Sequence, residues 1–497
     1  MKVLLRKGLK SDLTTLVVFA TKKSGKPNFG KIPAEIQKWA GLAESEGQFT
    51  GDKKESIFYR HAETLGYTNV LFVGMGEPGR EALRVAGSMA LGALKNHKVI
   101  SAAIFGDTVT KVLKAPGSAT QALAEGILLS AYDFAVHKTK GKDKKDKKPT
   151  LEEISIVLTA APSAADVKAL ARAEILTECQ NFARYLGDEP GNYMTPTILA
   201  NDTVKAAKGT KLKVTVWDKA RIKKENMGGI LAVNRGSTEE PRFIVMEYNG
   251  GGKGKKPICF VGKGLTFDTG GISIKPSAQM EEMKYDMCGG AAVIGAMLAI
   301  AKLKLKVNAI GLVPSTDNMP GPDAFKPGDI YYARNGKSVE VFNTDAEGRL
   351  ILGDALAYGS EQAPGMMVDA ATLTGAILVA LGNIHTGVFT RDSALMGRIQ
   401  KASEQTGELV WRMPLVDFHG EDMKGTHADL CNISGGRNAG SSTAAAFLEE
   451  FVEKGIPWAH FDIAGTAWNV ANRFPYNPKK GASGVMVRTF VELAENF

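Results

Sequence analysis

The sequence is poor in the residues that cross-link chains or bind soft metal ions. Only four of its 497 residues are cysteine and seven are histidine. Because the cysteines lie far apart and show no paired spacing, they argue against a disulfide framework and against a zinc knuckle. We expect all four to be reduced: Cys179, Cys259, Cys288 and Cys431. The histidines show no metal-ligand spacing either, and His460 is expected to be a buried residue with satisfied hydrogen bonds.

Long uninterrupted apolar runs are also missing. The uncharged run 370–390 is long enough to span a bilayer, but Thr, Gly, Asn and His interrupt it. We therefore expect it in a protein core and predict no transmembrane helix. The segment Met1–Lys7 is charged too early and too often to contain the apolar region of a signal peptide, so we expect a cytoplasmic protein. Hydrophobic residues make up 44% of the chain, enough for two sizeable cores.

A short acidic motif is the most informative feature present. Residues 343–349 read Asn-Thr-Asp-Ala-Glu-Gly-Arg and follow the β-type run 339–342. On an extended backbone alternate side chains share one face. Asp345, Glu347 and Arg349 are therefore expected to point into one pocket and to form part of a metal site. Taken alone, the motif is equally consistent with a solvated acidic turn.

A second acidic segment favours the metal site. Asp268 lies where an apolar strand breaks into a glycine-rich loop, close to Lys263 in the sequence. Lys275 follows, and then Asp286, which leads into a helix of small residues. Because the flanking residues are mostly Phe, Met, Gly and Ala, we expect these charges to be buried. Buried charges have to be paired or bound to metal.

The two segments together supply a hard, oxygen-rich set of ligands. Asp268, Asp286, Asp345, Glu347 and Lys263 suit Mn²⁺, Mg²⁺ or Zn²⁺ and would not select a soft ion. Carboxylates that share a cavity repel one another unless cations lie between them, and two divalent ions would balance four carboxylates. Two metals about 3.5–4 Å apart can lower the pKa of a bridging water and clamp a tetrahedral intermediate. Hydrolysis is therefore the expected reaction class.

From Asn181 to the C-terminus the sequence resembles the leucyl aminopeptidases, also called cytosol aminopeptidases, which are dinuclear metallopeptidases. The heptapeptide 343–349 is the most specific element of the resemblance. Three further blocks match in the same order: 261–271, 428–447 and 458–468. The first 165 residues match only in general pattern. The family's usual Asn-Glu-Pro near the domain junction reads Asp188-Glu189-Pro190 here, a departure that concerns packing and not chemistry.

The resemblance implies a role for each residue of the expected site. The tighter of two metal ions would have a ligand set that includes a lysine amine: Lys263, Asp268, Asp286 and Glu347. The more exchangeable ion would have carboxylate ligands only: Asp268, Asp345 and Glu347. Lys275 would polarise the scissile carbonyl, and Arg349 would hold a bicarbonate that acts as general base.

The residue types suit these roles. Lys263 can ligate a metal only as a neutral amine, so its pKa of about 10.4 must fall by roughly three units, which two adjacent dications can achieve. Lys275 should stay protonated, because a developing oxyanion needs a positively charged donor. Arg349 offers the planar fork that matches a carbonate, so its replacement by lysine should not be neutral.

The resemblance also implies an exopeptidase with a leucine-like preference. A free α-amine that ligates one metal would select the N-terminus, because internal peptides have no such ligand to offer. The side-chain pocket would be formed by small or apolar residues, for which ordinary core packing is the alternative: Met283, Thr372, Gly375, Ala464 and Ala467. Asp369, another acid in an apolar run, is expected to cap a loop rather than to bind metal.

The order of apolar and helical patterns predicts an α/β protein with two domains, each a mixed or mostly parallel sheet flanked by helices. Residues 1–165 are expected to form an oligomerisation or regulatory domain, and residues 166–497 the catalytic metallopeptidase domain. The first should contain strands at 16–19, 70–73, 99–105 and 154–158 and helices at 80–96 and 120–130. A helix over about 164–185 should lead to strands near 213–217, 243–247, 258–261, 309–312, 366–369 and 461–463. The family resemblance further implies a homohexamer of two trimers.

Two other features leave alternative functions open. The loop 74–79 follows a strand and opens a helix, which imitates a dinucleotide fingerprint, but Asp107 comes later than the usual spacing and Pro78 removes a backbone donor. A plain strand-to-helix turn is the alternative. The run 138–148 has seven lysines against two aspartates, and some bacterial family members bind DNA. Because the run lacks interleaved aromatic residues and arginines, it predicts at most a salt-sensitive, sequence-independent contact. A DNA-binding or regulatory protein that retains the peptidase fold is thus the second hypothesis.

Overall fold

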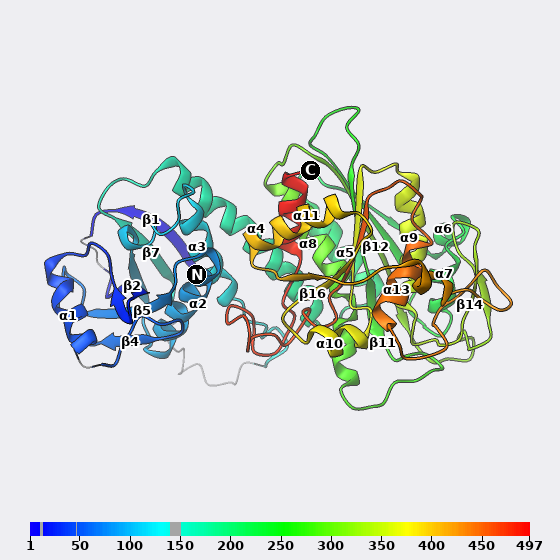
Figure 1. Cartoon of the computed structure of the whole chain (residues 1–497), viewed down its shortest axis with the longest axis horizontal. Coiled ribbons are helices and arrows are strands. Elements are labelled where there is room, and N and C mark those ends of the chain that lie inside the picture. The colour runs from blue at the N-terminus through cyan, green and yellow to red at the C-terminus, as the bar shows by residue number, and fades with distance from the viewer. Residues whose placement is uncertain (10–12, 46, 140–150) are drawn as a thin grey trace. The chain divides into compact units, whose positions relative to one another are not determined.

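The computed structural model describes residues 1–9, 13–45, 47–139 and 151–497 (Figure 1). Contacts divide these residues into two compact units, the first made of residues 1–178 and 474–478 and the second of 179–473 and 479–497. The division falls inside helix α4 (Ala164–Asp188). The boundary that we propose from the sequence, between residues 165 and 166, lies at the start of this helix. Most of the lysine-rich run 138–148 lies outside the described residues.

The first unit is built on a seven-stranded sheet. Its order is β1-β7-β6-β2-β5-β4, with β3 paired to β2. The central neighbours are parallel, whereas β3 and β4 pair antiparallel. The strands are β1 (Lys2–Lys7), β2 (Thr15–Lys23), β3 (Lys26–Asn28), β4 (Ser56–Tyr59), β5 (Asn69–Gly76), β6 (Ser101–Phe105) and β7 (Glu153–Leu158).

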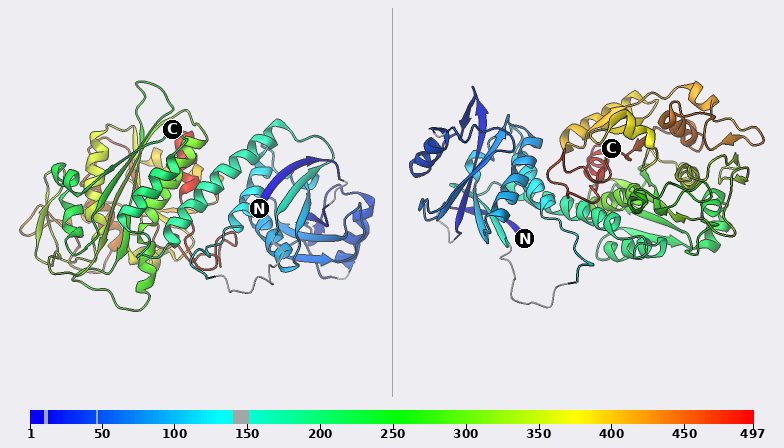
Figure 2. Two further views of the ribbon diagram at one scale, coloured as in Figure 1. Left: turned by 180° about the vertical axis from the view of Figure 1, so that it is seen from behind. Right: turned by 90° about the horizontal axis from the view of Figure 1, so that it is seen from below.

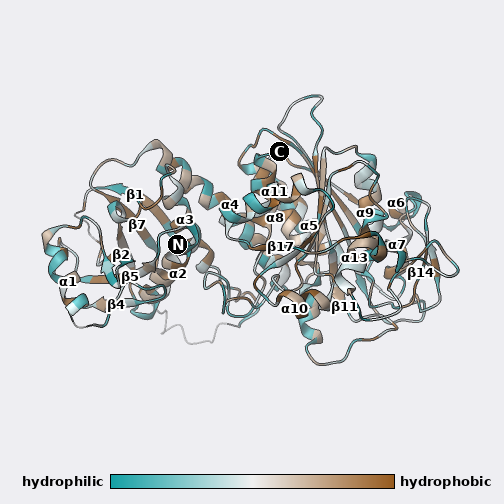
Figure 3. Cartoon of the chain, viewed as in Figure 1, coloured by the Kyte–Doolittle hydropathy of each residue, from teal (hydrophilic) through white to brown (hydrophobic). Residues whose placement is uncertain are grey.

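Helices cover both faces of this sheet, because the central strands are apolar on both sides. Alternate residues of β2 face opposite ways. Leu16 and Val18 belong to the core that includes Ile36 of α1 (Ala34–Ser45). Val17 and Phe19 belong to the core under α2 (Arg80–Asn96) and α3 (Ser118–Ser130). Figure 3 shows the resulting distribution, with apolar strands inside and polar residues on the outer sides of the helices.

The second unit contains a nine-stranded sheet and a separate three-stranded sheet. The large sheet has the order β17-β16-β19-β15-β10-β12-β9-β8, with β11 paired to β12, and the small one the order β13-β14-β18. The strands β19, β15, β10 and β12 run parallel. The bounds are β8 (Lys213–Trp217), β9 (Arg242–Asn249), β10 (Ile258–Gly262), β11 (Gly264–Asp268), β12 (Asn308–Asn318), β13 (Ile330–Tyr332), β14 (Ser338–Glu340), β15 (Met366–Ala371), β16 (Thr386–Phe389), β17 (Val410–Arg412), β18 (Leu430–Cys431) and β19 (Trp458–Asp462).

Helices also cover both faces of the large sheet (Figures 1 and 2). α7, α9 and α13 lie on one side and share an apolar core with β10, β12 and β15. α8, α11 and α14 lie on the other side, where Phe260 and Phe461 contact Phe490 of α14. The helices are α5 (Pro196–Ala207), α6 (Lys219–Lys224), α7 (Gly228–Asn234), α8 (Cys288–Lys302), α9 (Gly348–Glu361), α10 (Gly375–Leu381), α11 (Ser393–Thr406), α12 (Asp417–Glu421), α13 (Gly440–Glu449) and α14 (Val487–Glu495).

Most elements expected from the sequence are present, and the two-domain α/β fold is confirmed. The uncharged run 370–390 is divided among β15, α10 and β16, so it forms no continuous helix. Within the described residues one helical segment, Met280–Lys302, is long and apolar enough to cross a membrane, but 89% of its apolar window is buried inside the structure. The glycine loop 74–79 is the expected strand-to-helix turn between β5 and α2. All four cysteines are buried thiols.

Candidate metal centre

The heptapeptide 343–349 is a turn that leads into a helix, not an extended strand. β14 ends before the motif and α9 begins inside it, at Gly348. The amide of Ala346 donates to the carbonyl of Asn343 at 3.2 Å, and Glu347 has helical dihedrals (φ −81°, ψ −34°). The prediction that alternation along a strand brings Asp345 and Glu347 together is therefore wrong, because the motif is not extended. The turn nevertheless directs both carboxylates of the motif toward the residues that follow β10.

One part of the site is a buried cluster around Lys263. Its Nζ lies 2.7 Å from Asp286 Oδ2 and 2.9 Å from Glu347 Oε1, and it donates to the carbonyl of Thr372 at 3.1 Å. The lysine follows β10, Asp286 lies in the 3₁₀ helix Met280–Met287, and Glu347 precedes α9. Asp286, Glu347 and Asp268 can each place one carboxylate oxygen within 4.8 Å of the other two.

The second part of the site is centred on Lys275. Its Nζ lies 2.8 Å from Asp268 Oδ2 and 2.5 Å from Asp345 Oδ1. Asp268 is the last residue of β11 and is buried, whereas the side chain of Asp345 is 32% exposed. The structure thus brings together all four predicted carboxylates and both predicted lysines, with Asp268 common to both parts.

The charges of this cluster do not balance by themselves. Burial and then the charge of Asp268 raise the pKa of Glu347 to about 8, although Lys263 opposes the shift. Burial likewise raises the pKa of Asp286 to about 6, against the effect of Lys263. Burial alone would lower the pKa values of Lys263 and Lys275, but the surrounding carboxylates outweigh it and raise both above the usual value. Four carboxylates therefore compete for two ammonium groups.

Arg349 is a further buried cation, at the end of the acidic motif. It is buried in the first turn of α9, and its Nη1 donates to the carbonyl of Asn432 at 2.7 Å. Its Nε is buried and has no hydrogen-bond partner among the described residues. Burial lowers the pKa of Arg349 to about 10, while Glu347 partly offsets this effect. The guanidinium therefore stays charged at neutral pH, and its Nε–H group is available to donate a hydrogen bond.

Two asparagines that were not expected from the sequence hold the acidic motifs in place. Asn318, at the end of β12, donates to Asp268 Oδ1 at 2.9 Å and to the carbonyl of Thr344 at 3.0 Å. Asn432 accepts from the amide of Phe342 at 2.8 Å and donates to the carbonyl of Asn343 at 2.6 Å. Their partners are 26 to 90 residues away, so nothing in the local pattern marks them.

Two glycines allow the close approach of these segments. A Cβ at Gly348 would lie 2.5 Å from Cε and 2.6 Å from Nζ of Lys263. A Cβ at Gly270 would lie 2.8 Å from Asp345 Oδ1, and the φ of +86° there is one that glycine adopts without strain. Gly348 and Gly270 are therefore needed because a side chain at either position would collide with a residue of the metal centre.

Thr372 contacts the metal centre directly. Its Oγ1 donates to Asp286 Oδ1 at 2.6 Å, so its hydroxyl group is committed to an expected metal ligand. Asp462, at the end of β19, fixes the same loop by accepting from the amide of Leu373 at 3.2 Å and from Oγ1 of Thr374 at 2.6 Å. The loop after β15 thus positions Asp286, and Thr372 has this role whether or not it also lines a substrate pocket.

The other expected pocket residues differ in exposure. Gly375 is exposed at the start of α10, with nothing within 4 Å of an added Cβ, and Met283 is partly exposed. Ala464 and Ala467 are buried. Only part of this set is therefore open to solvent.

Asp369 has a different role from the expected one. It lies inside β15, where it accepts from Trp458 Nε1 at 2.9 Å and pairs with His460 Nδ1 at 2.6 Å. The prediction that it caps a loop is wrong, because two neighbours on β19 supply its partners. His460 is buried, as expected, but its Nε2 has no hydrogen-bond partner among the described residues.

The donor set fits divalent cations. It consists of hard carboxylate oxygens and one amine, the kind of ligands that Mn²⁺, Mg²⁺ and Zn²⁺ accept. Glu347 Oε2 is buried without a hydrogen-bond partner in the described chain, and such an oxygen is costly unless a cation or donor satisfies it. The cluster also has more carboxylates than ammonium groups, and bound cations would balance this excess of negative charge.

Models of known protein families match most of the chain. The family model described as "Cytosol aminopeptidase family, catalytic domain" matches residues 181–491, and the one for the N-terminal domain of that family matches residues 16–141. The chain belongs to the cytosol aminopeptidase family. It is therefore a hydrolase of the leucyl or cytosol aminopeptidase type, in a family that depends on metal.

Several relatives match over almost their whole length. A probable cytosol aminopeptidase of Bdellovibrio bacteriovorus is 54% identical over 500 residues, which cover 98% of this chain and 99% of the relative. A probable cytosol aminopeptidase of Geobacter sulfurreducens is 43% identical over 91% of this chain and 90% of its own length. Among solved structures, the bottromycin maturation enzyme BotP in complex with Mn superposes with a TM-score of 0.84 at 30% identity, and the match covers 97% of this chain and 99% of that one.

Proposed function

We propose that this aminopeptidase releases leucine-like residues from the N-termini of peptides and uses two divalent metal ions. The convergence of four carboxylates and two lysines in one largely buried cluster carries this proposal. One ion would be held by Lys263, Asp268, Asp286 and Glu347, and the other by Asp268, Asp345 and Glu347. Mn²⁺ and Zn²⁺ both suit these ligands, and the manganese complex of the related BotP supports the former.

The residues around the ions have separate tasks in this proposal. When bound, the two ions supply Lewis acidity that lowers the pKa of a water and polarises the scissile carbonyl. The ammonium group of Lys275 donates to the oxygen on which negative charge develops, a role that its carboxylate neighbours support by keeping it protonated. Arg349 offers its unpartnered Nε to a planar anion, and bicarbonate as a general base would fit this donor.

Lys263 needs the cations for its proposed role as a ligand. The carboxylates alone keep its amine protonated, since they raise its pKa. An unprotonated amine at this position therefore depends on cations held by the same carboxylates. This coupling means that metal binding should release a proton.

The remaining assignments describe the substrate and the assembly. Met283, Thr372, Gly375, Ala464 and Ala467 would form the side-chain pocket, and Gly375 supports this by opening to free space. Residues 1–165 would serve oligomerisation or regulation in a cytoplasmic homohexamer.

The need for a free amine provides the test of an exopeptidase. Leucine p-nitroanilide should be hydrolysed, while the N-acetylated compound should show a kcat/KM lower by about 10⁴-fold, because a site built to bind a polar group rejects an analogue that cannot make the contact. A continuous absorbance assay of nitroaniline release measures both. Comparable turnover of the two substrates would contradict the proposal and indicate an endopeptidase or an amidase.

The hydroxyl group of Thr372 should raise metal affinity. Thr372→Val keeps the shape of the side chain but removes the 2.6 Å bond to Asp286, and loss of such a supporting contact typically costs 10- to 100-fold in metal affinity. Equilibrium dialysis against buffered Mn²⁺ measures the change. Thr386→Val is the matched control, because it removes a buried hydroxyl whose partner is Thr466. Equal metal affinities in both variants and the unaltered protein would refute the role.

A further inference from the structure

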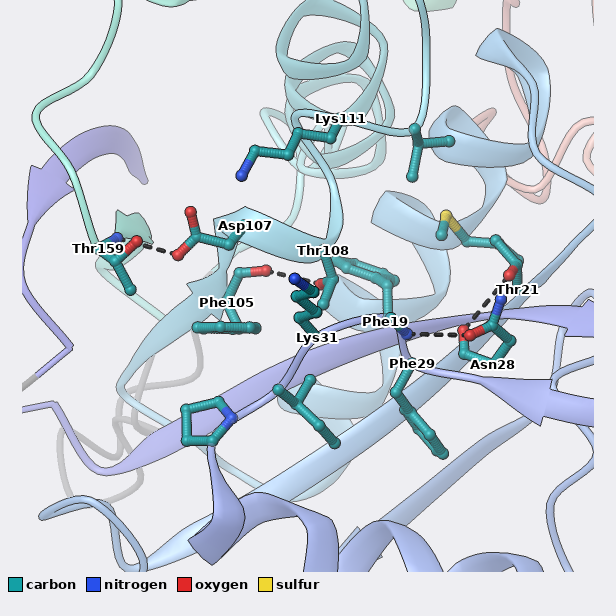
Figure 4. A pocket seen from close by; sticks show the side chains of 15 residues that line it. Phe19, Thr21, Asn28, Phe29, Lys31, Phe105, Asp107, Thr108, Lys111 and Thr159 are labelled. Carbon is teal, nitrogen blue, oxygen red and sulfur yellow. Dashed lines mark hydrogen bonds between the residues drawn. The ribbon is translucent and has the colours of Figure 1, made fainter.

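A cavity lies in the first unit, at the carboxyl ends of its central strands. Its volume is about 590 Å³, within the range of small-molecule sites. Phe19 and Thr21 of β2 and Phe105 of β6 form part of its wall, and so does Asp107, two residues beyond the end of β6. Figure 4 shows the side chains that line it.

The topology of the sheet marks this position. β2 and β6 are parallel neighbours, but the chain leaves them toward opposite faces. From β2 it runs through β3 to α1, which packs on one face, and from β6 it runs to α3, which packs on the other. Open α/β sheets bind ligands where the connections of two adjacent parallel strands run to opposite faces. The ligand lies in the crevice beyond the carboxyl ends of those two strands. The cavity occupies this switch point.

The cavity wall combines cationic and apolar surface. Lys31 and Lys111 come from opposite connections, the former from the segment after β3 and the latter from the segment after β6. Phe29 and Ile32 contribute partly exposed apolar side chains. The two lysines exceed the single lining carboxylate, Asp107, so the pocket favours an anion. Lysine binds phosphate as a point charge, whereas planar recognition of a carboxylate favours arginine.

Asp107 adds a hydrogen-bond acceptor to this wall. Its Oδ2 accepts the amide of Thr159 at 2.9 Å, which fixes the side chain and uses one of its two oxygens. In Figure 4 the side chain of Lys111 extends toward the side of the pocket where Asp107 and Thr159 meet. A ligand with hydroxyl groups beside its phosphate could bind the remaining oxygen of Asp107.

We infer that this crevice binds a nucleoside monophosphate. The phosphate would lie between Lys31 and Lys111, the sugar hydroxyls would donate to Asp107, and the base would cover the apolar wall at Phe29. The glycine-rich segment 74–79 begins inside β5, where a Cβ at Gly74 would lie 2.1 Å from the carbonyl oxygen of Asp52, so chain already fills the space beside that glycine.

Isothermal titration of the full-length protein with AMP, GMP, CMP and UMP tests this site. At least one nucleotide should bind saturably with a dissociation constant below about 1 mM. Its nucleoside and inorganic phosphate should each bind at least about tenfold more weakly, since each lacks one half of the contacts. Lys31→Ala and Lys111→Ala should each weaken binding by about tenfold, because each removes a charge-assisted contact.

Lys114→Ala is the matched control, since Lys114 is an exposed lysine that follows Lys111 in the sequence and does not line the cavity. It should leave the dissociation constant unchanged. The inference is overturned if none of the four nucleotides binds at 5 mM, a concentration well above the expected constant. It is also overturned if binding survives in the double variant of Lys31 and Lys111 but disappears in Asp345→Ala, which would place the nucleotide at the metal centre.

Discussion

Protein stripped of divalent metal should hydrolyse leucine p-nitroanilide at least about a thousandfold more slowly than metal-loaded protein, and added Mn²⁺ or Zn²⁺ should restore the rate. Charge stabilisation by a bound metal is worth several kcal/mol, and each 1.36 kcal/mol corresponds to a factor of ten in rate. Asp345→Ala should reproduce the loss even with metal present. Its side chain is 32% exposed, so the variant should fold.

Asp323→Ala provides the matched control for this substitution. Asp323 is an exposed aspartate of the same unit, outside the metal centre. Activity and metal content should both stay at the level of the unaltered protein. Full activity of the stripped protein, verified as metal-free by elemental analysis, would disprove metal dependence. Full activity of Asp345→Ala would instead remove Asp345 from the proposed ligand set and leave metal dependence intact.

The acidic residues could be predicted because their chemistry is local. Asp268 and Asp286 are charged residues within apolar and glycine-rich surroundings, and a buried charge requires a partner wherever the chain folds. The same reasoning identified Lys263 and Lys275 as members of the cluster. A buried charge needs a partner in any backbone conformation, so these residues could be predicted although residues 343–349 form a turn and are not extended.

Residues whose roles depend on distant partners could not be predicted. Asp369 looked like a loop cap because its partners, Trp458 and His460, are 89 and 91 residues away on a neighbouring strand. Asn432 has no periodic or compositional signal, although it fixes the turn of the acidic motif. Strand β1 was missed for the same reason, because its charged sequence becomes a strand through pairing with β7.

Lys275→Met should lower kcat for leucine p-nitroanilide by about 10²- to 10³-fold, the typical cost of losing one donor to a developing oxyanion. The KM should change much less, because the contact strengthens only as charge develops in the transition state. Initial-rate kinetics at saturating metal measure both constants. Lys253→Met removes an exposed lysine from a loop of the same unit and should leave both unchanged.

Metal content distinguishes a catalytic role of Lys275 from a purely structural one. The ammonium group lies 2.8 Å from Asp268 and 2.5 Å from Asp345, where it repels a cation bound by those carboxylates. Its removal should therefore leave metal affinity equal or higher, while kcat falls. Lys275→Arg keeps the positive charge and should recover part of the lost rate. If Lys275→Met instead binds metal more weakly and regains full kcat at high metal concentration, the lysine serves only to hold the carboxylates together.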